Sequence, residues 1–180
     1  MLEPPGLDPT VNAASAVGEV VLYNVFETLT KIQSDGTVQP LLAEKWEASP
    51  DQKVWTFHLR RDAKFHNGAP FNAAAVQFAF ARAASAQSTN KDKTLFASFE
   101  RIDAPDAYTV VLHSKNPNPN LPFLLGQATA IVVEPNSAAS NTTTPVGTGP
   151  YQLAEWRKGA SLVLKKWDGY RAASSIAMQQ

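Results

Sequence analysis

The sequence predicts a fold that combines β-strands with helices, and two neighbouring patterns carry this prediction. In residues 54–60 apolar and polar side chains alternate, which is the period of a strand with one buried face. Turn-forming residues bound this strand at 49–51 (SPD) and 66–68 (HNG). Asn72 is then the predicted N-cap of a helix. The helix carries one apolar stripe at helical spacing, formed by Val76, Ala79, Phe80 and Ala83.

The other elements follow from the same kinds of pattern. Residues 13–32 carry two adjacent apolar stripes, and we expect one long, deeply packed helix there. Residues 38–46 are interpreted as a short turn of helix. Two strands are predicted over 99–104 and 108–113, and a hairpin is predicted over 152–157 and 161–166.

Composition and charge narrow the classes of function. The 180 residues are 44% hydrophobic, which suits one globular domain. Sixteen basic and sixteen acidic residues cancel, and the short basic runs predict no nucleic-acid partner. The absence of cysteine excludes disulfides and thiolate chemistry. No apolar run reaches the ~18 residues of a membrane helix, and the polar, proline-rich start after Met1 is not a signal peptide.

The three histidines are the first candidates for acid–base catalysis, but their contexts favour ordinary structural roles. His58 lies on the polar face of a predicted strand, His66 lies in a turn, and His113 ends a strand. No pair has the spacing of metal ligands, and the common nucleophile and phosphate-binding motifs are missing. The sequence therefore predicts a chain that is not an enzyme and that carries no catalytic residue, metal or cofactor.

Four motifs, in order, resemble one family of binding proteins. They are residues 5–9 (PGLDP), 24–29 (NVFETL), 41–71 (LLAEKWEASPDQKVWTFHLRRDAKFHNGAPF), and 146–151 (VGTGPY) with Trp156 and Gly159. In these motifs the chain resembles the N-terminal part of the extracytoplasmic solute-binding proteins of peptide-type ABC importers. That family contains dipeptide-, oligopeptide-, nickel- and glutathione-binding proteins. Residues 72–76 (NAAAV) depart from the family, whose helix usually begins with acidic residues.

The resemblance implies an α/β (α+β) fold, with a mixed β-sheet and flanking helices, as the first lobe of a two-lobed protein. Family members are roughly three times longer than this chain. We therefore expect residues 1–180 to be a single domain, a truncated first lobe that lacks the family's first strand, second lobe and C-terminal return. On this interpretation the signal peptide is absent from this sequence, and the protein is periplasmic or extracytoplasmic.

The resemblance also implies where ligand binds. In the family, the loop that enters the first long helix faces the cleft, which indicates Asn12, Ala13, Ala14, Ser15 and Ala16 as ligand-binding residues. Small residues there would let a peptide backbone approach closely. Thr148 and Gly149 are further candidates. For the glycines of 146–151, two alternatives stay open: a tight turn, or direct contact with ligand.

The implied function is the capture of peptide-like solutes for an ABC importer, in a cleft between two lobes. The implied partners are a peptide or other small solute and, through the full-length protein, an ABC permease in the membrane. One lobe alone is expected to bind weakly, because it carries only part of the contacts. The alternative is a module that associates with itself or with a partner through the apolar face of an excised lobe.

Overall fold

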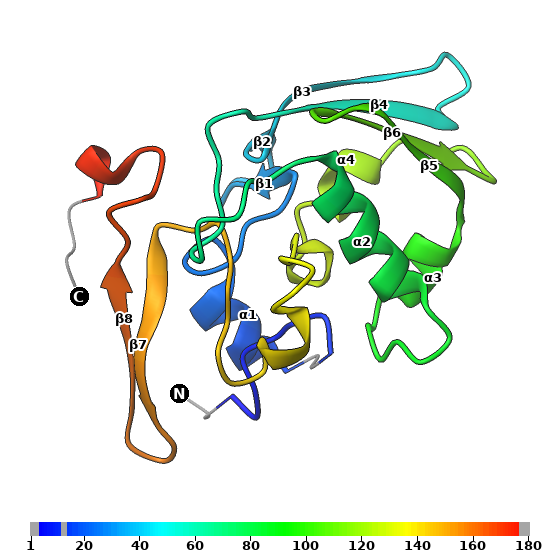
Figure 1. Ribbon diagram of the computed structural model, residues 1–180. Helices are drawn as coiled ribbons and strands as arrows, with labels where there is room; N and C mark the ends of the chain where they lie inside the picture. Colours follow the sequence, from blue (N-terminus) through cyan, green and yellow to red (C-terminus); the bar gives the residue numbers. More distant parts are fainter. Residues whose placement is uncertain (1–3, 12–13, 177–180) are drawn as a thin grey trace.

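A four-stranded antiparallel sheet forms an outer layer of the molecule, at the top of the view in Figure 1. The computed structural model describes residues 4–11 and 14–176. The strands lie in the order β3 (Ala43–Ala48), β4 (Val54–Leu59), β6 (Thr109–Ser114) and β5 (Phe99–Asp106). Each adjacent pair is antiparallel.

The connection between β4 and β5 makes this an α/β arrangement. The chain leaves β4, passes through α2 (Ala73–Ala84) and α3 (Lys93–Ala97), and enters β5. Since β6 lies between β4 and β5 and is antiparallel to both, β4 and β5 run in the same direction. The predicted fold class, strands with flanking helices, is confirmed. One detail differs, because neighbouring strands of this sheet all pair antiparallel where we expected a mixed sheet.

Part of the core lies between the sheet and α2, and the same buried cluster continues to α1 and residues 25–29. Alternation along β4 buries Trp55, Phe57 and Leu59, as the sequence predicts. The predicted stripe of α2 is buried as well, and Phe80 packs against the Phe96 ring with 5.1 Å between centroids. Asn72 caps α2, since its side-chain oxygen accepts a hydrogen bond from the Ala75 N–H at 3.2 Å. The strand–turn–helix prediction is therefore confirmed.

The long helix predicted over residues 13–32 is wrong. The structure has a short α1 (Ser15–Val21), then a turn, then β1 (Thr30–Ile32). The backbone becomes extended at Leu22, and Tyr23 has a positive φ of 62°, which cannot continue a right-handed helix. The apolar residues that suggested a helix are instead buried in a compact, non-helical segment, where Val25, Phe26 and Leu29 have 0% exposure.

The helical turn predicted within residues 38–46 is also wrong. The segment forms β2 (Val38–Pro40), which pairs with β1, and the start of β3. Shorter elements complete the body: α4 (Leu121–Leu124) and 3₁₀ turns at Ala128–Ala130, Ala138–Ser140 and Ala173–Ser175.

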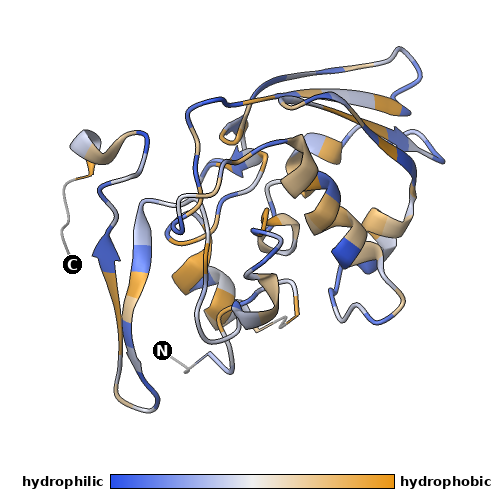
Figure 2. Cartoon of the chain, viewed as in Figure 1, coloured by the Kyte–Doolittle hydropathy of each residue, from blue (hydrophilic) through white to orange (hydrophobic). Residues whose placement is uncertain are grey.

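The predicted C-terminal hairpin is confirmed as β7 (Tyr151–Arg157) and β8 (Ser161–Lys166). Gly159, with a φ of 76°, supplies the left-handed residue of its turn. The hairpin projects from the body in Figure 1, and none of its side chains is fully buried. Figure 2 shows an apolar stretch along β8 that ends at two lysines.

Candidate functional site

A buried carboxylate, that of Glu27, joins the turn after α1 to the segment after the hairpin. Glu27 is 1% exposed. Arg171 donates to both carboxylate oxygens, from Nη1 to Oε2 and from Nη2 to Oε1, each at 2.8 Å. The Thr148 hydroxyl donates to Oε2 at 2.9 Å, and the Tyr170 hydroxyl donates to Oε1 at 3.2 Å. Four donated hydrogen bonds therefore satisfy a charge that burial would otherwise make costly.

Glu27, Thr148, Tyr170 and Arg171 form one cluster, the Glu27 cluster. Its electrostatics fix the protonation states of Tyr170 and Arg171. Burial, together with the negative charge of Glu27, raises the pKa of Tyr170 to about 12. Burial lowers the pKa of Arg171, but hydrogen bonds to Glu27 and its charge outweigh burial, so that the pKa is raised. Tyr170 thus stays a neutral donor and Arg171 stays a cation near neutral pH. The cluster holds structure together and has no group poised to transfer a proton.

The two glycines of 146–151 lie against the backbone of the turn after α1. Gly149 donates its N–H to the Val25 carbonyl at 3.0 Å, and Tyr151 donates to the Asn24 carbonyl at 2.9 Å. A Cβ on Gly147 would lie 1.9 Å from the Val25 oxygen, and one on Gly149 would lie 2.3 Å from the Asn24 oxygen. Neither glycine has a positive φ. The structure therefore explains the two glycines by something other than a tight turn. The two backbone segments approach too closely for either residue to carry a side chain.

The His66 ring also forms hydrogen bonds to the backbone of this glycine segment. The Gly147 N–H donates to Nδ1 at 3.3 Å, and Nε2 lies 3.0 Å from the Gly149 carbonyl oxygen. Since Nδ1 accepts a hydrogen bond, Nε2 carries the proton and the ring is neutral. Burial lowers the pKa of His66, which agrees with a neutral ring. The ring also packs edge-on against Trp167, with centroids 4.9 Å apart.

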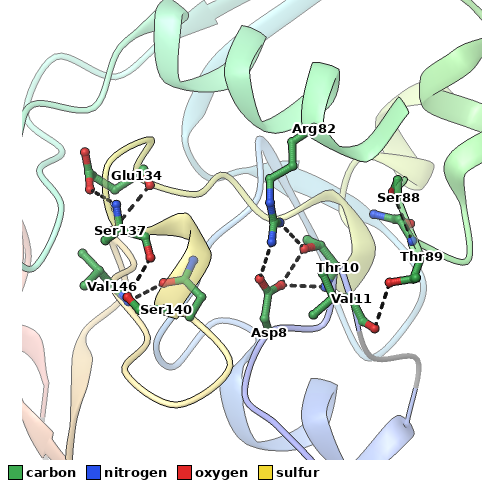
Figure 3. A network of polar contacts seen from close by, with 12 residues as sticks. Asp8, Thr10, Val11, Arg82, Ser88, Thr89, Glu134, Ser137, Ser140 and Val146 are labelled. Atoms are coloured by element: carbon green, nitrogen blue, oxygen red, sulfur yellow. Dashed lines mark hydrogen bonds and ion pairs between the residues drawn. The ribbon is translucent and has the colours of Figure 1, made fainter. Parts of the chain in front are cut away.

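A second buried carboxylate, that of Asp8, anchors the first motif of the chain to α2. Arg82 of α2 donates to Asp8 at 3.0 Å and to the Thr10 hydroxyl at 2.5 Å, and Thr10 donates in turn to Asp8 (Figure 3). Asp8 is completely buried. Figure 3 also shows the Thr89 hydroxyl bonded to the backbone oxygen of Val11, so that the loop after α2 holds the residues that follow this motif.

The predicted ligand-binding residues fall into two groups. Asn12 and Ala13 lie outside the described residues. Ala14 and Ser15 are exposed at the first turn of α1, and Ala16 is buried on its inner side. Thr148, which is 1% exposed, and Gly149 are buried beside residues 24–27, beyond the other end of α1.

An open groove of about 580 Å³, the β7 groove, was not foreseen from the sequence. Residues 152–156 of β7 and the loop residues 143–146 make up most of its lining. His66, Asn67 and Lys158 complete its lining. Its lining mixes backbone, apolar and charged groups, as is usual for sites that bind small molecules or peptides.

Residues 4–11 and 14–176 contain no group of three or more His, Asp or Glu side chains placed to hold a metal ion. No helix in these ranges is long and apolar enough to cross a bilayer.

Comparison with known proteins gives one family for most of the chain. Residues 37–177 match the model of the bacterial extracellular solute-binding proteins, family 5 (middle region). The chain is 31% identical over 168 residues to the glutathione-binding protein GsiB of Salmonella choleraesuis, covering 91% of this chain and 33% of GsiB. It is 32% identical over 179 residues to the probable D,D-dipeptide-binding periplasmic protein DdpA of Escherichia coli, covering 90% of this chain and 34% of DdpA.

Among solved structures, the chain resembles the Agrobacterium binding protein AgaA in complex with agropinic acid. The TM-score is 0.86 and the identity 31%, covering 93% of this chain and 35% of AgaA. The chain thus spans about a third of the length of the relatives that it matches. The names of the family and of these relatives describe binding proteins, which confirms the prediction of a binding protein rather than an enzyme.

Proposed function

Because the chain belongs to the bacterial extracellular solute-binding proteins, family 5, we propose that it forms part of the solute-capturing lobe of an ABC importer's binding protein. The observation that carries this proposal is the family match over residues 37–177. In this proposal residues 1–180 are a single domain, the first of two lobes. The second lobe belongs to the part of its relatives' length that this chain does not span.

The solute class that we propose is peptide-like. GsiB is named for glutathione and DdpA for D,D-dipeptides. Glutathione and D,D-dipeptides are both small, peptide-like molecules with free charged ends. AgaA, in contrast, was solved in complex with agropinic acid, a different small solute.

The proposed contact region on this lobe begins at the first turn of α1. Ala14 and Ser15 are exposed there, and their small side chains leave room for a ligand backbone. Asn12, Ala13 and Ala16 belong to the same prediction. Contact of ligand with Thr148 and Gly149 also stays a prediction, and both residues are buried in this chain.

The proposed mechanism is capture by closure of two lobes. Ligand that binds one lobe recruits the other by a hinge movement, and the closed form is the one that a membrane permease receives. Such a protein works outside the cytoplasm, as the name of the periplasmic relative DdpA indicates for that protein.

The proposal is tested by titrating the 180-residue chain with glutathione and with D-alanyl-D-alanine in a calorimeter. A full-length protein that binds at about 1 μM has about −8 kcal/mol of binding free energy. A single lobe keeps only part of these contacts, so we expect millimolar binding or weaker. Micromolar binding by this chain would contradict the one-lobe proposal.

Self-association is the alternative that the sequence left open, and it stays a prediction. The large hydrophobic side chains exposed in the described part are Val11, Phe78 and Phe123, which come from a loop, α2 and α4. Light scattering over a range of concentrations distinguishes the alternatives. A molar mass that stays at the 19.5 kDa of one chain would speak against assembly through an apolar face.

A further inference from the structure

The His66 ring holds the glycine segment, residues 146–151, in a way that only a neutral ring can. The Gly147 N–H donates to Nδ1 at 3.3 Å, and a backbone N–H cannot become an acceptor. Nε2 therefore carries the proton of the ring and donates it to the Gly149 carbonyl at 3.0 Å. A second proton, taken up from solvent, can bind only at Nδ1. It would place two donors, Nδ1–H and the Gly147 N–H, against each other.

Gly147 has no room to move away from such a conflict. A Cβ on this residue would lie 1.9 Å from the Val25 carbonyl oxygen, so its backbone already lies against the turn after α1. The next residue, Thr148, donates to Glu27 at 2.9 Å and is 1% exposed. The Gly149 N–H is bonded to the Val25 carbonyl at 3.0 Å. The backbone of Gly147 is therefore held in place by its neighbours.

The His66 ring, in contrast, can move. His66 is half-buried, and it lines the open β7 groove. A change of rotamer turns the ring about its side-chain bonds and leaves the backbone where it is. Such a rotation also breaks the edge-on packing on Trp167, where the centroids lie 4.9 Å apart. Movement of the ring into the groove therefore relieves the conflict without unfolding the chain.

The charges around the ring do not compensate a second proton. The negative charge of Glu27 favours the protonated ring, but burial outweighs it and lowers the pKa of His66. Arg171 already neutralises Glu27 through two bonds at 2.8 Å. The other titratable and charged side chains on the segments around the ring are Asp62, Lys64, Glu155, Lys158, Asp168 and Tyr170. Tyr170 is a neutral donor to Glu27, and the others are exposed, so that water and salt screen their charges.

We propose that His66 is an acid-sensitive switch: when the ring takes a second proton from solvent, it leaves Gly147 and Trp167 and turns into the β7 groove. The Glu27 cluster does not change, so the hairpin stays attached to the body of the molecule. The space that the ring leaves becomes part of the groove, whose shape therefore depends on pH. This inference goes beyond the proposed function, because it adds a response to acid that solute capture does not require.

The switch should operate below about pH 6.5. A ring that has turned into the groove has the ordinary pKa of about 6.5, whereas burial holds the pKa of the packed ring below that value. The rotated ring therefore binds the second proton more readily. Between the two pKa values, the ratio of rotated to packed molecules should rise roughly tenfold for each unit by which the pH falls. Below the lower pKa the ratio should stay constant.

The test follows the 180-residue chain by nuclear magnetic resonance from about pH 7.5 to about pH 5, above the ordinary range of carboxyl pKa values. The nitrogen shifts of the His66 ring should show a neutral form protonated at Nε2, which gains a proton at Nδ1 as the pH falls. With the same midpoint, we expect the nuclear Overhauser contact between the His66 and Trp167 rings to disappear. The protection of the Gly147 N–H against hydrogen exchange should fall, while the amides of β4 stay more strongly protected.

His66→Asn removes the titration and keeps the acceptor. The asparagine Oδ1 is as many bonds from the backbone as Nδ1, so it can accept the Gly147 N–H at every pH. We therefore expect the protection of Gly147 in this variant not to depend on pH. His58→Gln is the matched control, because His58 lies at the surface beside Glu47. This control should leave the pH dependence at Gly147 as it is in the original chain.

Three results, each measured on the original chain, would overturn the proposal. A neutral His66 ring with its proton on Nδ1 would remove the acceptor on which the switch depends. A ring that is protonated and keeps its contact with Trp167 would show that the charge is accommodated in place. Equal protection of Gly147 and of the β4 amides at every pH would show that the ring is released only when the whole chain unfolds.

Discussion

Arg171 and Glu27 form a two-pronged ion pair in the interior, with both nitrogen–oxygen distances at 2.8 Å and with side chains 8% and 2% exposed. The pair joins residues 144 positions apart in the sequence, from the turn after α1 to the segment after β8. It therefore fixes the base of the hairpin to the body of the molecule.

Replacing one partner of this pair should be strongly destabilising. Arg171→Met leaves the Glu27 carboxylate buried without its cation, and we expect the free energy of unfolding to fall by about 3–5 kcal/mol. The double variant Glu27→Gln/Arg171→Met removes both charges, so its loss should be smaller than the sum of the two single losses. Urea unfolding of the four proteins measures the difference.

The matched control is Arg101→Met, which removes an arginine from an exposed pair. Arg101 lies 2.7 Å from Asp103, with side chains 64% and 40% exposed. Exposed pairs contribute about 0–1 kcal/mol, so this change should have little effect. Equal losses for the Arg101 and Arg171 variants would contradict the importance of the buried pair.

His66 should make stability depend on pH. Burial holds its pKa in the folded chain below the ordinary value of 6.5, so the unfolded chain binds the proton more readily. The stabilising contribution is complete above about pH 6.5. It is lost as the pH falls from there toward the folded pKa. We expect His66→Gln, which cannot gain a proton, to show a smaller loss between pH 7 and pH 5.

The measurement is the difference in unfolding free energy between the original chain and His66→Gln at each pH. Taking this difference cancels the contributions of the other ionisable groups. A difference that stays constant across this range would refute the neutral, buried state of His66. His58→Gln serves as the control, since His58 lies at the surface beside Glu47.

The side chain of Asn72 should stabilise α2. Its Oδ1 accepts the Ala75 N–H at 3.2 Å, and the helix has no acidic residue in its first turn to assist. Asn72→Ala should lower the free energy of unfolding by about 1 kcal/mol, whereas Asn72→Ser keeps a capping oxygen and should cost little. Thermal unfolding of the three chains decides this, and equal effects of alanine and serine would argue against the cap.

The elements that could be predicted from the sequence are those whose pattern is local. Alternation in residues 54–60 and the stripe from Val76 to Ala83 each report one buried face, and both correspond to the structure. The prediction over 13–32 failed because dense apolar residues indicate burial without specifying conformation. Val25, Phe26 and Leu29 are buried as expected, but in a turn that Tyr23 begins.

The site could be predicted only in part, for a related reason. The motif around Gly147 and Gly149 indicated a specialised backbone, but the partner that makes glycine necessary lies more than a hundred residues earlier, at Asn24 and Val25. The pairing of Glu27 with Arg171 likewise depends on a contact between distant segments, and the β7 groove brings His66 and Asn67 to residues 143–158. A single sequence contains no local signal for such contacts.

Gly147 should tolerate no side chain, because a Cβ there would lie 1.9 Å from the Val25 carbonyl oxygen. Relief of this overlap requires one backbone segment to move, and moving it lengthens the hydrogen bonds from Gly149 and Tyr151 to the same turn. We expect Gly147→Ala to lower the free energy of unfolding by at least the ~1–3 kcal/mol typical of overpacking.

Gly18→Ala is the matched control for the Gly147 prediction. Gly18 lies inside α1, where the nearest atom to a new Cβ is the Ala128 Cβ at 3.5 Å, an ordinary contact. Since alanine favours helix over glycine by about 1 kcal/mol, this substitution should be neutral or stabilising. If chemical denaturation gave both alanine variants the same stability, the close approach of residues 147–149 to the turn after α1 would not be what requires glycine.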